Sequence, residues 1–244
     1  MTTDTNSPII VLVAGHWLGA WAWDDVLEHL ETDRARAVAV TLPGLDGDDP
    51  ARSTRTLDDQ AEAIDDLLTR LDVSEEQPAT LVAHSGANAP VSMALDRHPE
   101  LVHRVVWVDS GPMANRSAFA PGFPEEELPL PPFEVLAQQA SLDGLSTDVL
   151  ERFRSRAVPE PGPVLRQPVE LANDARTAVP TTLVCCSIPS SQVLDMAREG
   201  HPLFAEVANL ETLDVVDLPT GHWPMWSRAR DLAEVIRSAA SRTS

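Results

Sequence analysis

Ser85 stands at the end of an apolar run and is flanked by small residues. Ala83 lies two positions before it, Ala87 two positions after it, and Gly86 follows directly. A serine hydroxyl is a weak nucleophile unless it projects from the backbone toward a base. A strained strand-to-helix turn with small neighbours achieves this, and it directs the amide of Gly86, at the helix start, toward developing negative charge. The segment therefore predicts an acyl-transfer nucleophile, although alanines replace the usual glycines and an ordinary turn is the alternative.

Two further reactive side chains also follow predicted strands. Asp109 comes directly after an apolar run, and His222 follows the last such run in the sequence Thr-Gly-His. Ligands of parallel sheets bind at the carboxyl ends of the strands. We therefore expect Ser85, Asp109 and His222 to converge at one edge of a sheet, in the chain order that suits acyl transfer on such a sheet.

The elements that must position these residues alternate along the chain. Strands are predicted over residues 9–14, 37–41, 80–84, 105–108, 181–187 and 213–218. Helices are predicted over residues 21–32, 57–71, 87–97 and 228–240, the last with Ser227 as its N-cap. Continuous apolar strands separated by helices predict an α/β fold, with a mostly parallel six-stranded sheet and helices on both faces.

Residues 111–178 break this alternation. The segment is rich in proline and glutamate, and it holds two short helical patterns near residues 133–140 and 146–156. It also keeps enough large apolar side chains to dock on the rest of the protein, among them Phe119 and Phe153. We predict a small helical cap over residues 111–178 and a core of residues 1–110 and 179–244. A disordered insertion is the alternative.

Composition narrows the possible partners. The 244 residues carry a net charge of −20, which argues against a nucleic-acid or anionic-membrane partner. No apolar run is long enough to cross a bilayer, and the first residues do not resemble a signal peptide. The two adjacent cysteines, Cys185 and Cys186, favour buried thiols in a reducing cytoplasm. No metal-ligand cluster or phosphate-binding glycine loop stands out, so we expect a small-molecule substrate, no metal and no cofactor.

Two further segments resemble the α/β-hydrolase superfamily, and within it the small plant methyl esterases, hydroxynitrile lyases and their bacterial relatives. Residues 15–23, Gly-His-Trp-Leu-Gly-Ala-Trp-Ala-Trp, are similar to the family sequence His-Gly-Ala-x-x-Gly-Ala-Trp-x-Trp, whose first position is 14 here. Residues 221–227, Gly-His-Trp-Pro-Met-Trp-Ser, are similar to Asp-His-Met-Pro-Met-Leu-Ser. The chain resembles the superfamily over nearly its whole length, and with the serine turn these two segments imply its fold and a catalytic triad.

The resemblance assigns roles to the matching positions. It implies that His222 is the general base and that the backbone amides of His16 and Gly86 form the oxyanion hole. Trp17 is the tryptophan we expect beside the substrate pocket. Ala14 replaces a family histidine, a change that should affect the hydrogen bonds of the loop more than these amides.

The acidic residue of the implied triad departs from the common family pattern. The usual aspartate follows the strand at 181–187, and the matching residues 187–191, Ser-Ile-Pro-Ser-Ser, contain no carboxylate. Haloalkane dehalogenases are among the superfamily members that carry the acid after the preceding strand, and Asp109 matches that position. The alternatives are that Asp109 only caps the next turn, that Asp195 replaces it, or that Ser85 and His222 act as a dyad.

We therefore predict a serine hydrolase that cleaves a small carboxylic ester or lactone through an acyl-enzyme. One alternative is a non-hydrolytic lyase, cyclase or cofactor-independent oxygenase on the same fold, and another is a catalytically silent binding protein. The cyanohydrin lyases carry a lysine after the catalytic histidine. Trp223 stands there in this chain, which contains no lysine, so the sequence argues against that lyase.

Overall fold

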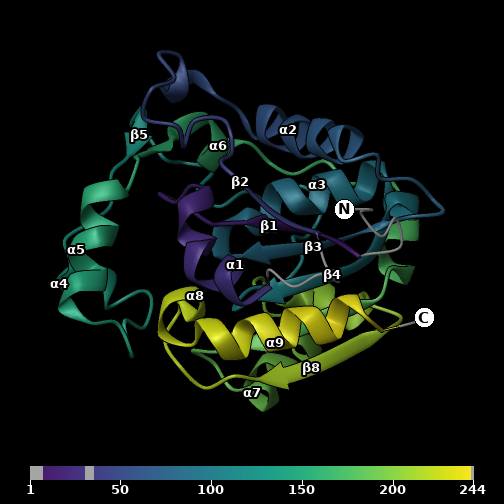
Figure 1. The fold of residues 1–244 in the computed structure, drawn as a ribbon. Coiled ribbons are helices and arrows are strands. Elements are labelled where there is room, and N and C mark those ends of the chain that lie inside the picture. Colours follow the sequence, from purple (N-terminus) through teal and green to yellow (C-terminus); the bar gives the residue numbers. More distant parts are fainter. Residues whose placement is uncertain (1–7, 31–35, 243–244) are drawn as a thin grey trace, which may run out of the picture.

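A six-stranded sheet runs through the centre of the computed structural model, which describes residues 8–30 and 36–242 (Figure 1). In spatial order its strands are β2 (Arg36–Val40), β1 (Ile9–Val13), β3 (Ala79–His84), β4 (Val102–Val108), β7 (Thr181–Cys185) and β8 (Leu213–Asp217). Every neighbouring pair in this sheet is parallel, so all six carboxyl ends lie along one edge. The predicted α/β fold with a parallel six-stranded sheet is confirmed.

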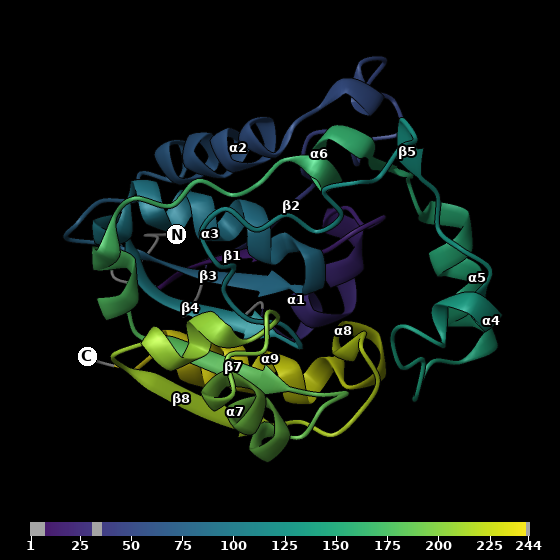
Figure 2. The same cartoon turned by 180° about the vertical axis from the view of Figure 1, so that it is seen from behind.

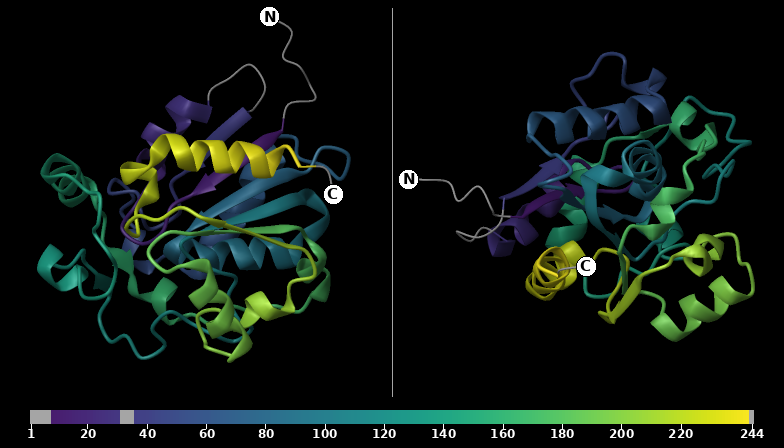
Figure 3. Two further views of the ribbon diagram at one scale, coloured as in Figure 1. Left: turned by 90° about the horizontal axis from the view of Figure 1, so that it is seen from below. Right: turned by 90° about the vertical axis from the view of Figure 1, so that its right-hand side faces the viewer.

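Helices cover both faces of the sheet (Figure 3). One face carries α2 (Leu57–Arg70), α3 (Asn88–Arg97) and α7 (Ser190–Arg198), and the other carries α1 (Asp24–Leu30) and α9 (Ala229–Ala240). Short 3₁₀ turns lie at residues 20–23, 52–54, 85–87, 99–101, 174–178 and 205–209. The helix predicted over 21–32 is thus a 3₁₀ turn followed by α1, and its last two residues lie outside the described ranges.

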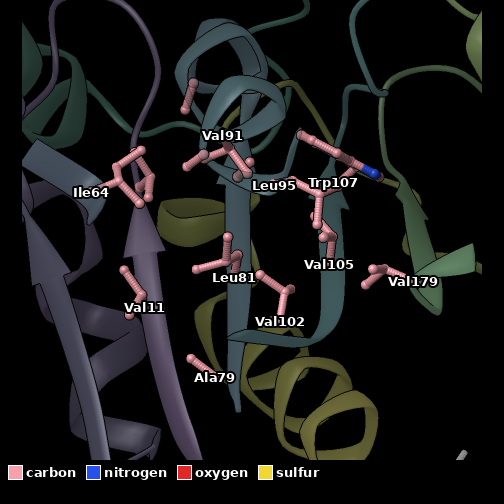
Figure 4. Close-up of a cluster of buried hydrophobic side chains, with 14 of the residues drawn as sticks. Val11, Ile64, Ala79, Leu81, Val91, Leu95, Val102, Val105, Trp107 and Val179 are labelled. Atoms are coloured by element: carbon pink, nitrogen blue, oxygen red, sulfur yellow. The ribbon is translucent and has the colours of Figure 1, made fainter. Parts of the chain in front are cut away.

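Strand β1 shows why the strands of the central sheet are unbroken apolar runs in the sequence. All five of its residues are buried. Val11 packs into the cluster that α2 and α3 cover, shown in Figure 4, whereas Ile10 and Leu12 face the cluster beneath α1 and α9. Because side chains alternate between two covered faces, no position along the strand favours a polar residue.

The segment between β4 and β7 is built from short elements. They are β5 (Glu127–Leu128), α4 (Phe133–Leu136), α5 (Thr147–Arg156), β6 (Glu160–Pro161) and α6 (Gly162–Arg166), and β5 pairs antiparallel with β6. Figures 1 and 2 show α4 and α5 standing to one side of the sheet. Val169 and Leu171, further along, are buried with Leu57 of α2 and Met93 of α3. The cap boundaries at 111 and 178 stay predictions.

The predicted N-cap at Ser227 is wrong. Ser227 is the last residue of a short helix, α8 (Pro224–Ser227), and α9 starts only at Ala229. The Ser227 hydroxyl bonds the Thr220 hydroxyl at 2.7 Å and donates to the Trp223 carbonyl at 3.3 Å. Pro224 suits a first helical position, so a helix begins directly after the His222 turn, and the non-helical backbone at Arg228 (φ −142°, ψ 41°) interrupts it. Helix α7 was not predicted.

The Phe153 side chain packs α5 against the core. Removal of this side chain should strongly reduce the stability of the protein. Its side chain is fully buried, with ring centroids 5.4 Å from Trp223 and 5.0 Å from Trp226. We expect Phe153→Ala to lower the free energy of unfolding by about 3–5 kcal/mol in a urea titration. Val135→Ala, at an exposed position of α4, is the control and should change it by less than about 0.5 kcal/mol. A decrease in the free energy of unfolding as small as that of the control would contradict this packing.

Candidate active site

Ser85 lies at the turn between β3 and α3 in a strained backbone conformation. Its φ is +52°, a left-handed value that is uncommon for residues other than glycine. The flanking Ala83 and Ala87 are both buried, so larger side chains at these positions would collide with the core. The local sequence thus forms the sharp turn that was predicted, and the strain is held by the strand and helix on either side.

The loop after β1 lies directly against this turn. A Cβ atom added to Gly15 would sit 2.9 Å from the Gly86 nitrogen and 2.9 Å from the Ser85 Cβ. Only glycine permits so close an approach of the two backbones. The loop therefore brings the backbone at Gly15, next to His16, against the Gly86 amide. An oxyanion hole formed by the His16 and Gly86 amides stays a prediction.

His222 links Ser85 to Asp109 by two short hydrogen bonds. Its Nε2 lies 2.8 Å from the Ser85 Oγ, and its Nδ1 lies 2.6 Å from the Asp109 Oδ2. The backbone amide of His222 donates to the Ser141 carbonyl at 2.8 Å, which holds the histidine loop against the segment before α5. Three side chains separated by up to 137 positions in the chain thus form one hydrogen-bonded series.

Asp109 is held by the loop that follows β7. Its Oδ1 accepts from the backbone amides of Cys186 and Ser187 at 3.0 and 2.9 Å, and its Oδ2 accepts from the Ser187 hydroxyl at 2.5 Å. Burial raises the pKa of Asp109, but the bonds from His222 and Ser187 outweigh it and hold the pKa below its usual value. The carboxylate is therefore ionised and aimed at the imidazole.

Sequence reasoning missed this role of Ser187. The loop at 187–191 lacks the usual acid, yet it supplies the donors that orient Asp109. The position of Ser187 just after the buried strand β7 was the available signal, but the partner could be identified only once β4 and β7 were known to be neighbours. Asp195, the alternative acid, lies on α7 with 66% of its side chain exposed, and it pairs with Arg198 at 2.5 Å.

His84 holds the loop that carries His222. It is fully buried, and its Nε2 lies 2.7 Å from the backbone oxygen of His222. Burial, reinforced by the nearby His222, lowers the pKa of His84 to about 3. The ring is therefore neutral near pH 7, and its Nε2–H donates to the His222 carbonyl.

This buried neutral histidine should make the protein sensitive to mild acid. The unfolded chain binds a proton at His84 near pH 6.5, whereas the folded protein does so only near pH 3, so stability falls as the pH drops between these values. The slope is about 1.4 kcal/mol per pH unit for one proton. His84→Gln keeps a donor for His222 and should reduce the difference in unfolding free energy between pH 6.5 and 5 by about 1.5 kcal/mol. The exposed His201→Gln is the control, and an equal effect from it would contradict the assignment.

Trp17 connects the loop after β1 to the predicted cap. Its indole Nε1 donates to the Leu128 carbonyl at 2.9 Å, and its own carbonyl accepts from the Val158 amide at 3.0 Å. The side chain is buried, and the backbone φ is +66°. Contact with a substrate at this position stays a prediction.

Within residues 8–30 and 36–242, no group of three or more His, Cys, Asp or Glu side chains is arranged to hold a metal ion. No helix of those residues is long and apolar enough to cross a membrane. Cys185 and Cys186 are both buried free thiols.

A comparison with protein families matches residues 10–235 to the one described as "Alpha/beta hydrolase family". The chain belongs to the alpha/beta hydrolase family. Two curated relatives from Arabidopsis thaliana are named putative methylesterase 14, chloroplastic, and putative methylesterase 12, chloroplastic. They are 35% and 33% identical to this chain over 99 residues, which is 40% of this chain and 28% of the length of each relative. The resemblance to the methylesterase branch that the sequence motifs suggest is confirmed.

Solved structures of this family share the fold over almost the whole chain. An extracellular alpha/beta-hydrolase from a Paenibacillus species has a TM-score of 0.76 at 18% identity and covers 96% of this chain and 100% of its own. The Arabidopsis methylesterase MES16 has a TM-score of 0.71 at 19% identity, covering 96% and 99%. At these identities the likeness establishes the fold.

Proposed function

We propose that the protein is a serine hydrolase that cleaves small carboxylic esters through an acyl-enzyme. The observation that carries the proposal is the series Ser85–His222–Asp109, with contacts of 2.8 and 2.6 Å and with Ser85 at the strained turn. Membership of a hydrolase family and the methylesterase relatives support ester hydrolysis as the general class.

In the first half-reaction, Ser85 attacks the carbonyl carbon of the ester. The proton leaves the Ser85 Oγ for the His222 Nε2, a carbon–oxygen bond forms, and the carbonyl electron pair moves onto its oxygen. The amides of His16 and Gly86 stabilise that oxyanion. Asp109 stabilises the imidazolium of His222, which then protonates the departing alcohol as the tetrahedral intermediate collapses to the acyl-enzyme.

In the second half-reaction, a water molecule replaces the alcohol. His222 takes a proton from this water, the hydroxyl oxygen attacks the acyl carbon, and the same oxyanion hole holds the second intermediate. The proton returns through His222 to the Ser85 Oγ as the carbon–oxygen bond to serine breaks. The cycle releases one carboxylic acid and one alcohol for each water consumed.

Methyl esters are the first substrates to test, because the curated relatives carry the name methylesterase. We expect the purified protein to release methanol from methyl esters of small carboxylic acids. We also expect p-nitrophenyl acetate and butyrate to turn over faster than the octanoate ester. Lactones of similar size form a second panel, and product acids would be quantified by chromatography.

Two outcomes would overturn this proposal in different ways. Hydrolysis of no ester or lactone, with Ser85 still labelled by a fluorophosphonate, would point to non-hydrolytic chemistry on the same framework. Absence of both hydrolysis and labelling in a folded sample would favour a silent binding protein.

A further inference from the structure

His16 and Glu160 form a buried pair beside the nucleophile turn. The His16 Nδ1 lies 3.1 Å from the Glu160 Oε2, and the two side chains are 9% and 2% exposed. Glu160 also receives longer bonds, both of 3.4 Å, from the Trp17 amide and the Gln60 side-chain amide. The pair joins the loop after β1 to strand β6, in the segment predicted to form the cap.

Within the described ranges, the second ring nitrogen of His16, the buried Nε2, makes no hydrogen bond. This nitrogen points at Gly86: a Cβ atom on that glycine would lie 2.4 Å from the Nε2 and 2.6 Å from each neighbouring ring carbon. The imidazole tip therefore fills the space that a side chain after the nucleophile would otherwise occupy. The Phe119 ring lies edge-on against His16, 4.4 Å between centroids.

The surroundings of Glu160 bear on what the free nitrogen can do. The Glu160 side chain is 2% exposed, and a carboxylate charge so deeply buried is costly unless a positive group lies beside it. The Glu160 oxygens accept from the Trp17 and Gln60 amides and face the His16 Nδ1. An imidazole with hydrogens on both nitrogens would compensate the carboxylate, and its Nε2–H would be a donor without an acceptor.

We propose that the His16 imidazole is a third, side-chain donor of the oxyanion hole, and that Glu160 positions it. The inference rests on the proposed ester hydrolysis. As the ester carbonyl oxygen becomes negative next to the Gly86 amide, it provides the acceptor that the Nε2–H lacks. A donor held in place before the reaction begins stabilises this charge without reorganisation. The assignment is particular to this chain, because the family sequence quoted above carries alanine where His16 stands.

A set of substitutions separates this role from packing. His16→Phe keeps an aromatic ring and the backbone amide but removes the donor, and we expect kcat on a methyl ester to fall about 10–100-fold, with KM changed by less than about 3-fold. Glu160→Gln keeps the shape of the side chain and removes its charge, and kcat should fall about 3–10-fold. Glu127→Gln, the same change on the paired strand β5, is the matched control and should leave kcat unchanged.

Binding of a boronic acid provides a readout that packing alone would not change. Phenylboronic acid forms a tetrahedral anion on the serine, so its affinity should weaken about 10–100-fold in His16→Phe, whereas affinity for the neutral product alcohol should not change. Unchanged kcat and boronate affinity in both variants would overturn the proposal. If His16→Phe fails to fold, Glu160→Gln provides the test. A kcat and a boronate affinity equal to those of the wild-type protein would then contradict the proposal. Wild-type protein that is neither labelled at Ser85 nor active on esters would instead disprove the proposed function.

Discussion

Replacement of Ser85 by alanine should abolish ester turnover, with kcat lowered by about 10⁶-fold. The change removes the Ser85 Oγ, which lies 2.8 Å from the His222 Nε2, so no acyl-enzyme can form. Any residual hydrolysis would come from water activated by His222. Wild-type protein should take up one fluorophosphonate per chain, located on Ser85 by mass spectrometry, and the variant should take up none.

A nearby serine is the control for this experiment. Ser110 follows β4 at the same edge of the sheet, and its hydroxyl makes only a long, 3.5 Å bond to the Ala83 carbonyl. Ser110→Ala should retain both labelling and turnover. An adduct on another residue of the wild-type protein, or turnover that survives Ser85→Ala, would remove Ser85 from the mechanism.

The second large effect is expected from Asp109→Asn, which should lower kcat by about 10⁴-fold with little change in KM. The backbone amides of Cys186 and Ser187 donate to one carboxylate oxygen, so they should hold the asparagine oxygen there and turn its NH₂ toward His222. The His222 Nδ1 must then accept, its proton moves to Nε2, and the ring can no longer take the Ser85 proton. The same substitution in the serine-protease triad lowers kcat by about 10⁴-fold for this reason.

Asp195→Asn tests the competing acid with the same chemical change. Its carboxylate is exposed on α7 and bound to Arg198, so kcat should stay within about 2-fold of the wild-type value. Both variants should be compared by urea titration, because a role of Asp109 as a turn cap would appear as a loss of about 1 kcal/mol with kcat unchanged. A near-normal kcat in Asp109→Asn would leave a Ser85–His222 dyad.

Much of the fold could be predicted because its strands are buried on both faces. Runs such as residues 9–14 contain no polar positions, and this pattern identifies central strands of a parallel sheet. Helix α7 was harder to predict, because its start at Ser190 follows Pro189 in a segment that was read only for a missing acid. The break at Arg228 was also missed, because the sequence does not reveal the non-helical backbone at that residue.

By itself the sequence determined that a small-residue turn carries Ser85 and that Asp109 and His222 follow strands of the same sheet. Those are local properties, which depend on residue size and on the order of elements along the chain. Only the tertiary structure decided what surrounds these residues. The donors of Ser187 meet Asp109 because β4 and β7 are neighbours, and Glu160 meets His16 because the segment after α5 returns to the loop after β1. Such contacts join residues 78 and 144 positions apart, and no local pattern encodes a pairing that depends on how distant elements pack.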